Sequence, residues 1–355
     1  MDAFFIMSKK TDIRTLDSEE LKAFLKANNE NTFRCNQIEL WLWQKQAGSF
    51  DEMSNLSIGL REKLKDQFTI IQSKILDTQK SSDGTIKLAF ELYDNAKVEG
   101  VIIPSKDRYT ACVSTQVGCS LDCKFCATGY LKKVRNMFAY EIVEQVHHLN
   151  TVCENTFGKR LTNIVYMGMG EPLLNYKNVI RSIEMISNKD GLGFSQKRIT
   201  VSTSGISKMI RKLGDDEVKF NLALSLHAAD NEKRSRLMSI NTSNPLEEVI
   251  DALKHFTIKT KRKVTFEYVA LNKINDHKED ALALAKWCGL LNAKVNIINF
   301  NPIDHANFTP TTEKRLNDFI QHLLLKNVNV SVRKSRGKDI DAACGQLANK
   351  LTNGN

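Results

Sequence analysis

The chain has 355 residues, of which 42% are hydrophobic and 26% charged, and its net charge is +10. No apolar run approaches the ~18 residues of a transmembrane helix, and the apolar patch at residues 4–7 has the wrong length and charge order for a secretory signal. We therefore expect a cytoplasmic protein without membrane association, whose eight cysteines are ligands, catalytic groups or core residues. The basic excess favours a polyanionic partner such as nucleic acid.

Residues 1–75 are predicted to form a small helical domain. Asp17 can cap a helix whose apolar side chains at positions 21, 24 and 25 share one face. A second helix is expected at CNQIELWLWQKQ and a third at SNLSIGLREKLKDQF. Within residues 76–107, the alternating stretch after the turn SSDG is typical of an antiparallel hairpin, which we expect to link the helices to the next domain.

Residues 108–348 alternate between short β-branched runs and helical patterns. Strands are predicted at 110–115, 163–168, 198–203, 220–226, 264–271 and 295–300, with a last strand at VNVSVR. Helices are expected at AYEIVEQVHHL, NYKNVIRSIEMIS, PLEEVIDALKHF, HKEDALALAKWCGLL and TEKRLNDFIQHLLL. Six β–α units in series predict an α/β fold with a parallel sheet, either doubly wound or barrel-like, followed by a tail at 349–355.

Polar and glycine-rich residues follow nearly every predicted strand. In chain order they are CSLDCKFC, GMGEP (168–172), STSG (202–205), SLHAA (225–229) and NFNP (299–302). Ordinary βα loops also use glycine and serine, so each stretch alone is uninformative. Because the carboxyl ends of parallel strands meet at one edge, the five together predict a large ligand across the mouth of a curved sheet.

The first of these stretches contains Cys119, Cys123 and Cys126. A structural zinc site uses four ligands, usually as two pairs. A [4Fe–4S] cluster held by three thiolates instead leaves one iron open, where a substrate can bind. Core cysteines and a zinc site completed by Cys153 or Cys35 are the alternatives.

The C-x3-C-x2-C spacing, with Phe125 before the third cysteine, resembles the radical S-adenosylmethionine (SAM) superfamily. The stretches VSTQVGCSLDCKFCATG, MGMGEPLLN, VSTSG, SLHA and RKSRGKDIDAACGQLA resemble the RlmN family of adenine-C2 RNA methyltransferases, and TFRCNQIELWLW and NLSIGLREKL resemble its accessory domain. The resemblance covers nearly the whole chain. It implies a partial (β/α)6 TIM-like radical SAM barrel, an N-terminal helical RNA-binding accessory domain and a short β extension, with a [4Fe–4S] cluster and SAM as cofactors.

The resemblance also implies a cofactor site. Cys119, Cys123 and Cys126 would bind the cluster, and its fourth iron would hold the amino and carboxylate groups of SAM. The other cofactor-binding positions would be Gly170, Glu171, Ser202, Ser225, Leu226, His227, Asn301 and Phe125. Taken alone, a histidine such as His227 is more often a hydrogen-bonded rim residue, and a serine such as Ser202 is most often a turn residue.

Two more cysteines acquire roles from the resemblance, although each in isolation would be a small buried apolar residue. Cys344 would take a methyl group from one SAM. A 5′-deoxyadenosyl radical made from a second SAM would then remove a hydrogen atom from that methyl group, and the carbon would add to adenine C2. Glu99 would accept the C2 proton. Cys112 would attack the Cys344 sulfur, which releases methylated RNA and leaves a transient disulfide.

The expected RNA partners are 23S rRNA, modified at the peptidyl transferase centre, and tRNA, modified beside the anticodon. A reductant such as flavodoxin or ferredoxin is also expected. The protein itself is expected to be a monomer. The nearest alternative is the sister activity at adenine C8, which shares these cysteines. GEPLLN and RKSRGKDIDAACG favour C2. An RNA-binding module with a cluster or zinc would explain the basic charge and the helical domain. It would not explain Cys112, Cys344 or the polar strand ends.

Overall fold

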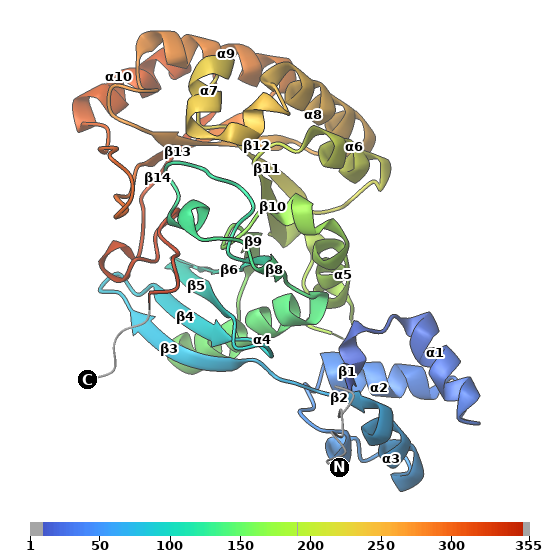
Figure 1. Ribbon diagram of the computed structural model, residues 1–355. Coiled ribbons are helices and arrows are strands. Elements are labelled where there is room, and N and C mark those ends of the chain that lie inside the picture. The colour runs from blue at the N-terminus through green and yellow to red at the C-terminus, as the bar shows by residue number, and fades with distance from the viewer. Residues whose placement is uncertain (1–9, 190, 351–355) are drawn as a thin grey trace, which may run out of the picture.

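The computed structural model describes residues 10–189 and 191–350, so the apolar patch at 4–7 and residues 351–355 of the predicted tail lie outside it. Figure 1 shows a small group of helices beside a larger α/β domain built on one curved sheet. No helix in the described ranges combines the length and the apolar character that crossing a membrane requires.

The N-terminal helical domain contains the three helices predicted from the sequence. They are α1 (Ser18–Ala27), α2 (Arg34–Trp43) and α3 (Ile58–Gln67). Asp17 caps α1 as predicted, because its carboxylate accepts hydrogen bonds from the amides of Glu19 and Glu20, and Glu20 returns one to the Asp17 amide. The helices enclose a core of their own that includes Leu25 and Ile38. Two short strands, β1 (Thr11–Asp12) and β2 (Phe68–Thr69), pair in parallel and bring together the two ends of this domain.

The helical domain is joined to the larger domain by buried polar contacts with α4 (Ala139–Phe157). Arg14 forms ion pairs with Asp12 at 2.7 Å and with Glu144 of α4, and its guanidinium lies over the Tyr140 ring. Nearby, His147 of α4 is buried and hydrogen-bonds the backbone of Trp43. The helical domain therefore packs against α4 of the larger domain.

The larger domain is built on a ten-stranded sheet with the order β14-β13-β12-β11-β10-β9-β6-β5-β4-β3. The parallel strands are β6 (Arg108–Cys112), β9 (Asn163–Tyr166), β10 (Ile199–Thr203), β11 (Asn221–Ser225), β12 (Val264–Ala270), β13 (Lys294–Asn299) and β14 (Val330–Arg333). All seven were predicted, with bounds that differ by a few residues. Their β-branched and apolar side chains are buried because helices cover the sheet.

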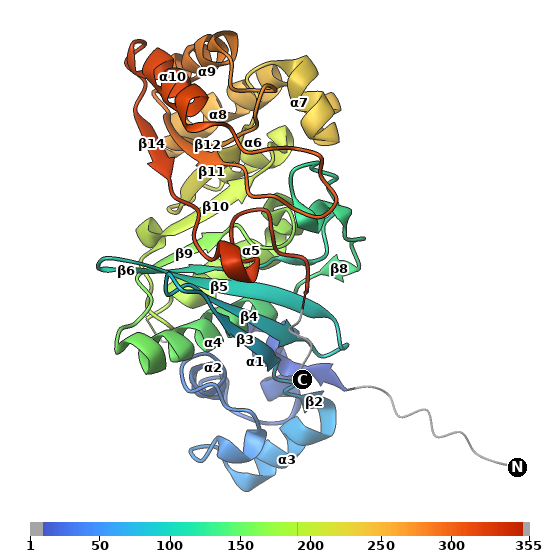
Figure 2. The ribbon, with the colours of Figure 1, turned by 90° about the vertical axis from the view of Figure 1, so that its left-hand side faces the viewer.

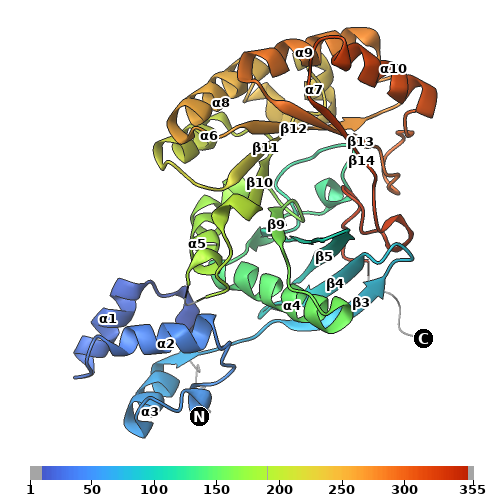
Figure 3. The same ribbon diagram turned by 180° about the vertical axis from the view of Figure 1, so that it is seen from behind.

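Helices follow the parallel strands and cover the outer face of the sheet, as Figure 3 shows. Besides α4 they are α5 (Tyr176–Ser187), α6 (Ser207–Asp215), α8 (Leu246–Thr260), α9 (Lys278–Leu291) and α10 (Glu313–Leu324); α7 (Asn231–Leu237) is a short helix after β11. The sequence patterns did not predict α6 or α7, which have nine and seven residues. The successive β–α units form the predicted partial (β/α)6 barrel.

On the other side of β6 the sheet continues as an antiparallel extension. Its strands are β5 (Lys97–Ser105), β4 (Ile86–Glu91) and β3 (Lys74–Lys80). The predicted hairpin is present as β4 and β5. The C-terminal segment packs against this extension (Figure 2), where Asp339 accepts hydrogen bonds from Ser81 and Ser82, and Asp83 accepts one from the amide of Gly337.

A candidate active site at the mouth of the barrel

The three cysteines of the motif lie in the loop that connects β6 to α4. Gly118 precedes them with φ +74°, and a Cβ there would be 2.3 Å from the Lys132 carbonyl oxygen, so only glycine fits this approach. The loop also holds the short pair β7 (Gln116–Val117) and β8 (Arg135–Asn136). These constraints fix the path of the loop over the carboxyl edge of the sheet.

The surroundings of Cys119, Cys123 and Cys126 fit a polynuclear cluster. The Leu121 amide donates a hydrogen bond to the Cys119 sulfur at 3.4 Å, and Thr128 and Gly129 donate to Cys126. Donors of this kind stabilise thiolates that ligate a cluster. Burial raises the pKa of all three thiols, and the neighbouring thiols raise that of Cys123 further. Cluster binding must therefore release their protons.

Zinc does not fit the same arrangement. Within residues 10–189 and 191–350, no three His, Cys, Asp or Glu side chains gather so that they could hold a single metal ion. The thiols of a three-cysteine cubane site bind three different irons, so they do not need to converge on one point. The two cysteines that could complete a zinc site are both buried in hydrophobic cores, Cys35 in that of the helical domain and Cys153 in that of the large domain.

Gly170 and Glu171 form a buried corner beside the cysteine loop. Gly170 has φ +95°, and a Cβ there would be 2.5 Å from the Gln116 Cβ. The Glu171 carboxylate accepts hydrogen bonds from Thr203 Oγ1 at 2.8 Å, from the Ser204 amide at 2.8 Å and from the Leu173 amide at 3.1 Å. Burial raises the Glu171 pKa, and these donors oppose that shift. The corner thus links the ends of β9 and β10.

The predicted rim residues of β10 and β11 lie together. Ser202 and Ser225 face each other across the two strands, with their Oγ atoms 3.2 Å apart. Leu226 is buried, and its amide donates to the Glu267 carbonyl of β12 at 3.0 Å. The two hydroxyls therefore form a small polar patch, the kind of surface that a ribose or an amino acid group of a ligand can hydrogen-bond.

His227 is a rigid residue with left-handed backbone, φ 56°. Its Nδ1 accepts a hydrogen bond from the Val269 amide at 3.1 Å. Its ring packs edge to face against the Phe125 ring, with the two ring centroids 4.5 Å apart. Burial and the nearby Arg234 charge lower the His227 pKa to about 3, so the ring is neutral. The neutral ring and Phe125 together position the cysteine loop over β11 and β12.

Cys112 and Cys344 meet in this site although 231 residues separate them in the sequence. Cys112 ends β6 and is buried, and burial together with the Cys344 thiol raises its pKa to about 12. The Cys344 residue is exposed at the barrel mouth, while desolvation of its sulfur and the nearby Cys126 thiol of the cysteine loop raise its pKa to about 12. The free thiols of Cys112 and Cys344 are thus neighbours next to the motif, one on β6 and the other on the C-terminal segment.

The loop that carries Cys344 is tied to three parts of the site. The Ala127 amide donates to the Gly345 carbonyl at 2.7 Å, and Thr128 Oγ1 donates to the Leu347 carbonyl at 2.7 Å. Asn301, after β13, donates from Nδ2 to the Cys344 carbonyl at 3.1 Å. Figure 1 shows this segment beside the loop that follows β6.

Glu99 of β5 provides the third tie. Its Oε2 accepts hydrogen bonds from the amides of Ala348 at 2.9 Å and Asn349 at 3.0 Å, while Oε1 faces Lys87 Nζ at 3.2 Å. Glu99 and Lys87 are both buried. The glutamate is therefore neither a surface residue nor remote from Cys344, since it holds the segment that follows the cysteine.

Sequence reasoning missed two residues of the site. Gln116 orients the glycine corner, because its Oε1 accepts from the Glu171 amide at 3.0 Å; nothing in the pattern around it indicates this. Glu267 lies in the middle of β12 and accepts a hydrogen bond from Asn296, and its carboxylate adds to the effect of burial and of Cys126 in raising the Cys344 pKa. An acidic residue within the apolar run VTFEYVAL was the available signal.

Comparisons with known proteins show the family and the fold of this chain. The model of the "Radical SAM superfamily" matches residues 113–285, and that of the "Ribosomal RNA large subunit methyltransferase N-terminal domain" matches residues 11–70. A probable dual-specificity RNA methyltransferase RlmN from Flavobacterium psychrophilum is 51% identical over 342 residues, 96% of this chain and 99% of that protein. The dual-specificity RNA methyltransferase RlmN of Anaeromyxobacter sp. is 41% identical over 96% of this chain and 91% of its own length. The crystal structure of a radical SAM methyltransferase from Sphaerobacter thermophilus superposes with a TM-score of 0.88 at 38% identity, covering 95% of this chain and 99% of that one.

Proposed function

The chain belongs to the RlmN family of radical SAM RNA methyltransferases, and from this premise we propose that it methylates C2 of one adenine in the peptidyl transferase centre of 23S rRNA and of the adenosine 3′ of the anticodon in tRNA. Its cofactors are a [4Fe–4S] cluster and SAM, as membership of the superfamily implies. The observation that supports the methyl-carrier mechanism most directly is the proximity of Cys112 and Cys344 beside the cysteine loop, and the stretches GEPLLN and RKSRGKDIDAACG favour C2 as the target atom.

A carrier cysteine answers a chemical difficulty. Adenine C2 is an electron-poor carbon and cannot readily displace a methyl group from SAM. The Cys344 sulfur is a nucleophile: it loses its proton, forms a bond to the methyl carbon of one SAM, and the methyl–sulfonium bond of SAM breaks. The exposure of Cys344 at the mouth admits both SAM and a base of the RNA to this sulfur.

The residues around the sulfur have distinct tasks. Cys119, Cys123 and Cys126 would hold the cluster, and Gly170, Glu171, Ser202, Ser225, Leu226, His227, Asn301 and Phe125 would line the SAM site. When bound there, the cluster and a second SAM supply the radical that removes a hydrogen atom from the S-methyl group. Cys344 then carries the carbon to adenine C2, and Glu99 accepts the C2 proton.

Release of the product requires Cys112. Its thiolate forms a bond to the Cys344 sulfur as the bond from that sulfur to the RNA-borne carbon breaks. The carbon takes up a proton to become the product methyl group, and the unpaired electron left by the radical addition passes to a one-electron carrier of the flavodoxin or ferredoxin class. A Cys112–Cys344 disulfide remains, which an external thiol reductant resets. Electrons for SAM cleavage would come from flavodoxin or ferredoxin. We assign residues 1–75 to RNA binding, 76–107 to the β extension, 108–348 to catalysis and 349–355 to a tail, in a cytoplasmic monomer. Because the C2 edge of one base must reach the carbon on Cys344 inside the barrel mouth, the target base leaves its stack.

Intact-mass analysis of the anaerobically purified protein tests the carrier. We expect one methyl group on Cys344, absent from Cys344→Ala and retained by Cys35→Ala, which removes a buried cysteine of the helical domain. Full RNA methylation by Cys344→Ala would refute the mechanism. Mass spectrometry of nucleosides from the treated RNA should show 2-methyladenosine, and 8-methyladenosine would assign the sister activity instead.

A further inference from the structure

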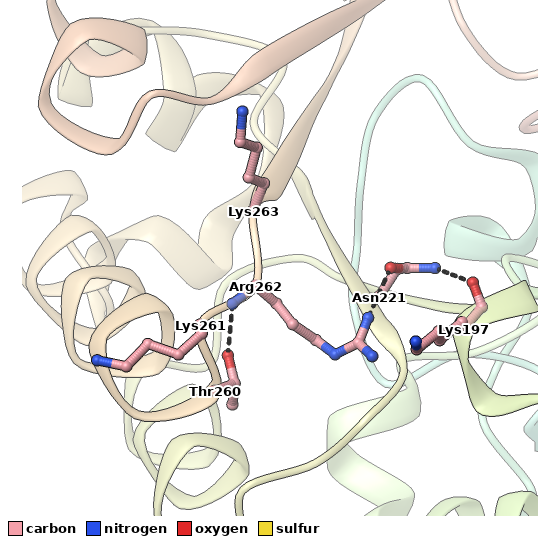
Figure 4. Close-up of a pocket in the computed structure, with 6 residues that line it drawn as sticks. All are labelled: Lys197, Asn221, Thr260, Lys261, Arg262 and Lys263. Atoms are coloured by element: carbon pink, nitrogen blue, oxygen red, sulfur yellow. Dashed lines mark hydrogen bonds between the residues drawn. The ribbon is translucent and has the colours of Figure 1, made fainter.

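A basic hollow of about 480 Å³ lies at the edge of the sheet opposite the candidate active site. Figure 4 shows its lining, which consists of Lys197, Asn221, Thr260, Lys261, Arg262 and Lys263. These residues precede or begin β10, β11 and β12, whereas Ser202 and Ser225 end β10 and β11. The hollow and the site therefore occupy opposite edges of the same strands.

The charge of the hollow is uncompensated. Four of its six lining residues are cations, and none is acidic. Among the residues that the structure describes, none of the four cations takes part in an ion pair, whereas lysines and arginines elsewhere in the chain do. Four neighbouring positive charges repel one another unless a negative ligand joins them.

One of the cations is held in place. Arg262 is half-buried, and its guanidinium donates to Asn221 Oδ1 at 3.1 Å. Asn221 in turn donates from Nδ2 to the backbone carbonyls of Lys197 at 2.8 Å and Ile199 at 3.2 Å. Figure 4 shows the Arg262 side chain extending towards Asn221 and Lys197. A fixed guanidinium suits the fork-like recognition of phosphate oxygens.

The dipole of α8 accounts for only part of this arrangement. Lys261 caps the carboxyl end of α8, where a positive charge is favourable. It does so with φ 57°, a conformation in which glycine or asparagine is usual. The dipole also reaches Arg262 and Lys263, which follow Lys261 directly, but not Lys197, which comes from the segment before β10.

We propose that this hollow binds the phosphodiester backbone of the substrate RNA, at a segment remote from the target adenine; the proposal rests on the proposed RNA methylation. The path from Lys197 to Ser202 along β10 is five residues, or ~17 Å, and the route around the surface is longer. At ~3.4 Å per nucleotide, about five or more nucleotides must separate the target base from the phosphates in the hollow. Long RNAs would therefore gain affinity from the hollow, and oligonucleotides of a few residues would not.

The test neutralises the three exposed lysines together as Lys197→Gln, Lys261→Asn and Lys263→Gln, with asparagine chosen because it tolerates the left-handed backbone. The matched control is Lys278→Gln, Lys314→Gln and Lys326→Gln, which removes the same charge from exposed sites on α9 and α10 and after α10. Equilibrium binding of each protein to a 23S rRNA fragment that contains the target adenine is measured from 50 to 200 mM salt.

Loss of three phosphate contacts should reduce the slope of log K against log salt by about 2. Wild-type affinity should then fall about 16-fold more than that of the hollow variant over this range, while the control follows the wild type. Equal slopes for the hollow and control variants would overturn the proposal. So would unchanged RNA affinity with lost binding to phosphatidylserine vesicles, since the ligand would then be a membrane.

The outcome is independent of the reaction. Binding requires no turnover, so the hollow can be shown to hold RNA even if the wild-type protein methylates a different atom. Conversely, a wild-type enzyme that forms 2-methyladenosine while all three proteins share one salt slope would retain the proposed function and refute the RNA site in the hollow. Methylation of Cys344, measured by intact mass without RNA, should be the same in all three proteins.

Discussion

Replacing Gly170 with alanine should destabilise the fold in two ways, through a steric clash and through unfavourable backbone conformation, and a control substitution can separate them. In Gly170→Ala the new methyl group would lie 2.5 Å from Gln116 Cβ, 2.6 Å from its Cγ and 2.9 Å from its backbone nitrogen. Gln116 cannot easily move away, because it is fully buried and its side chain bonds the Glu171 amide and Asn136. The backbone itself, at φ +95°, is also unfavourable for alanine.

The magnitudes follow from these two terms. An L-residue in left-handed backbone costs about 1–2 kcal/mol, and an extra methyl group in a packed interior costs about 1–3 kcal/mol. Gly170→Ala should therefore lower the free energy of unfolding by about 2–5 kcal/mol. Gly158→Ala is the control: its φ is +62°, but no atom lies within 4 Å of the new methyl group, so only the backbone cost of about 1–2 kcal/mol applies.

Urea unfolding of both variants measures the difference, and SAM binding to the folded proteins measures its consequence. Gly170→Ala should weaken SAM binding because the clash displaces Gln116 and with it the Glu171 amide, whereas Gly158→Ala, at the end of α4, should leave it unchanged. If the two variants lost the same unfolding free energy, the close approach of Gly170 to Gln116 would be wrong as an explanation for this glycine.

Three more predictions concern the cysteine pair, the glutamate and a buried histidine. Cys112→Ala should accumulate RNA covalently bound to Cys344, seen as a slow band with labelled RNA in a denaturing gel; free methylated RNA at the normal rate would exclude a resolving role. Glu99→Ala should stall with the same adduct while intact mass still shows a methylated Cys344, and loss of that methyl group would mean that Glu99 only anchors the loop. Burial and the neighbouring His148 charge lower the His147 pKa from 6.5 to about 4. The folded protein therefore keeps His147 neutral at pH values where the unfolded chain already protonates it. This contribution to the free energy of unfolding is complete above pH 6.5 and is lost as the pH falls towards 4. Between pH 7 and pH 5 the wild type should lose about 2 kcal/mol of unfolding free energy more than His147→Gln, and parallel pH profiles would contradict this.

Much of the fold follows from local patterns. The parallel strands are visible in the sequence because runs such as NIVYMG and RITVST contain β-branched and apolar residues that must be buried, with helices covering the outer face of the sheet. The edge that binds ligands is also predictable, since the carboxyl ends of parallel strands meet in space. Thus Ser202 and Ser225, which are 23 residues apart in the sequence, could be expected to be neighbours, and their hydroxyls are 3.2 Å apart. Short helices such as α7 are not predicted, because seven residues are too few to show the 3.6-residue hydrophobic period of a helix.

The environment of Cys344 could not be predicted in this way, because no periodicity connects a C-terminal loop to a particular partner. Its position depends on single hydrogen bonds from Ala127, Thr128 and Asn301 and on the carboxylate of Glu99. These four partners come from three different parts of the fold: the cysteine loop, the rim after β13 and the antiparallel extension. A displacement of any of these parts would move the thiol relative to Cys112. The antiparallel extension is therefore more than a link between domains, because a buried glutamate on β5 holds the chain four and five residues after the cysteine.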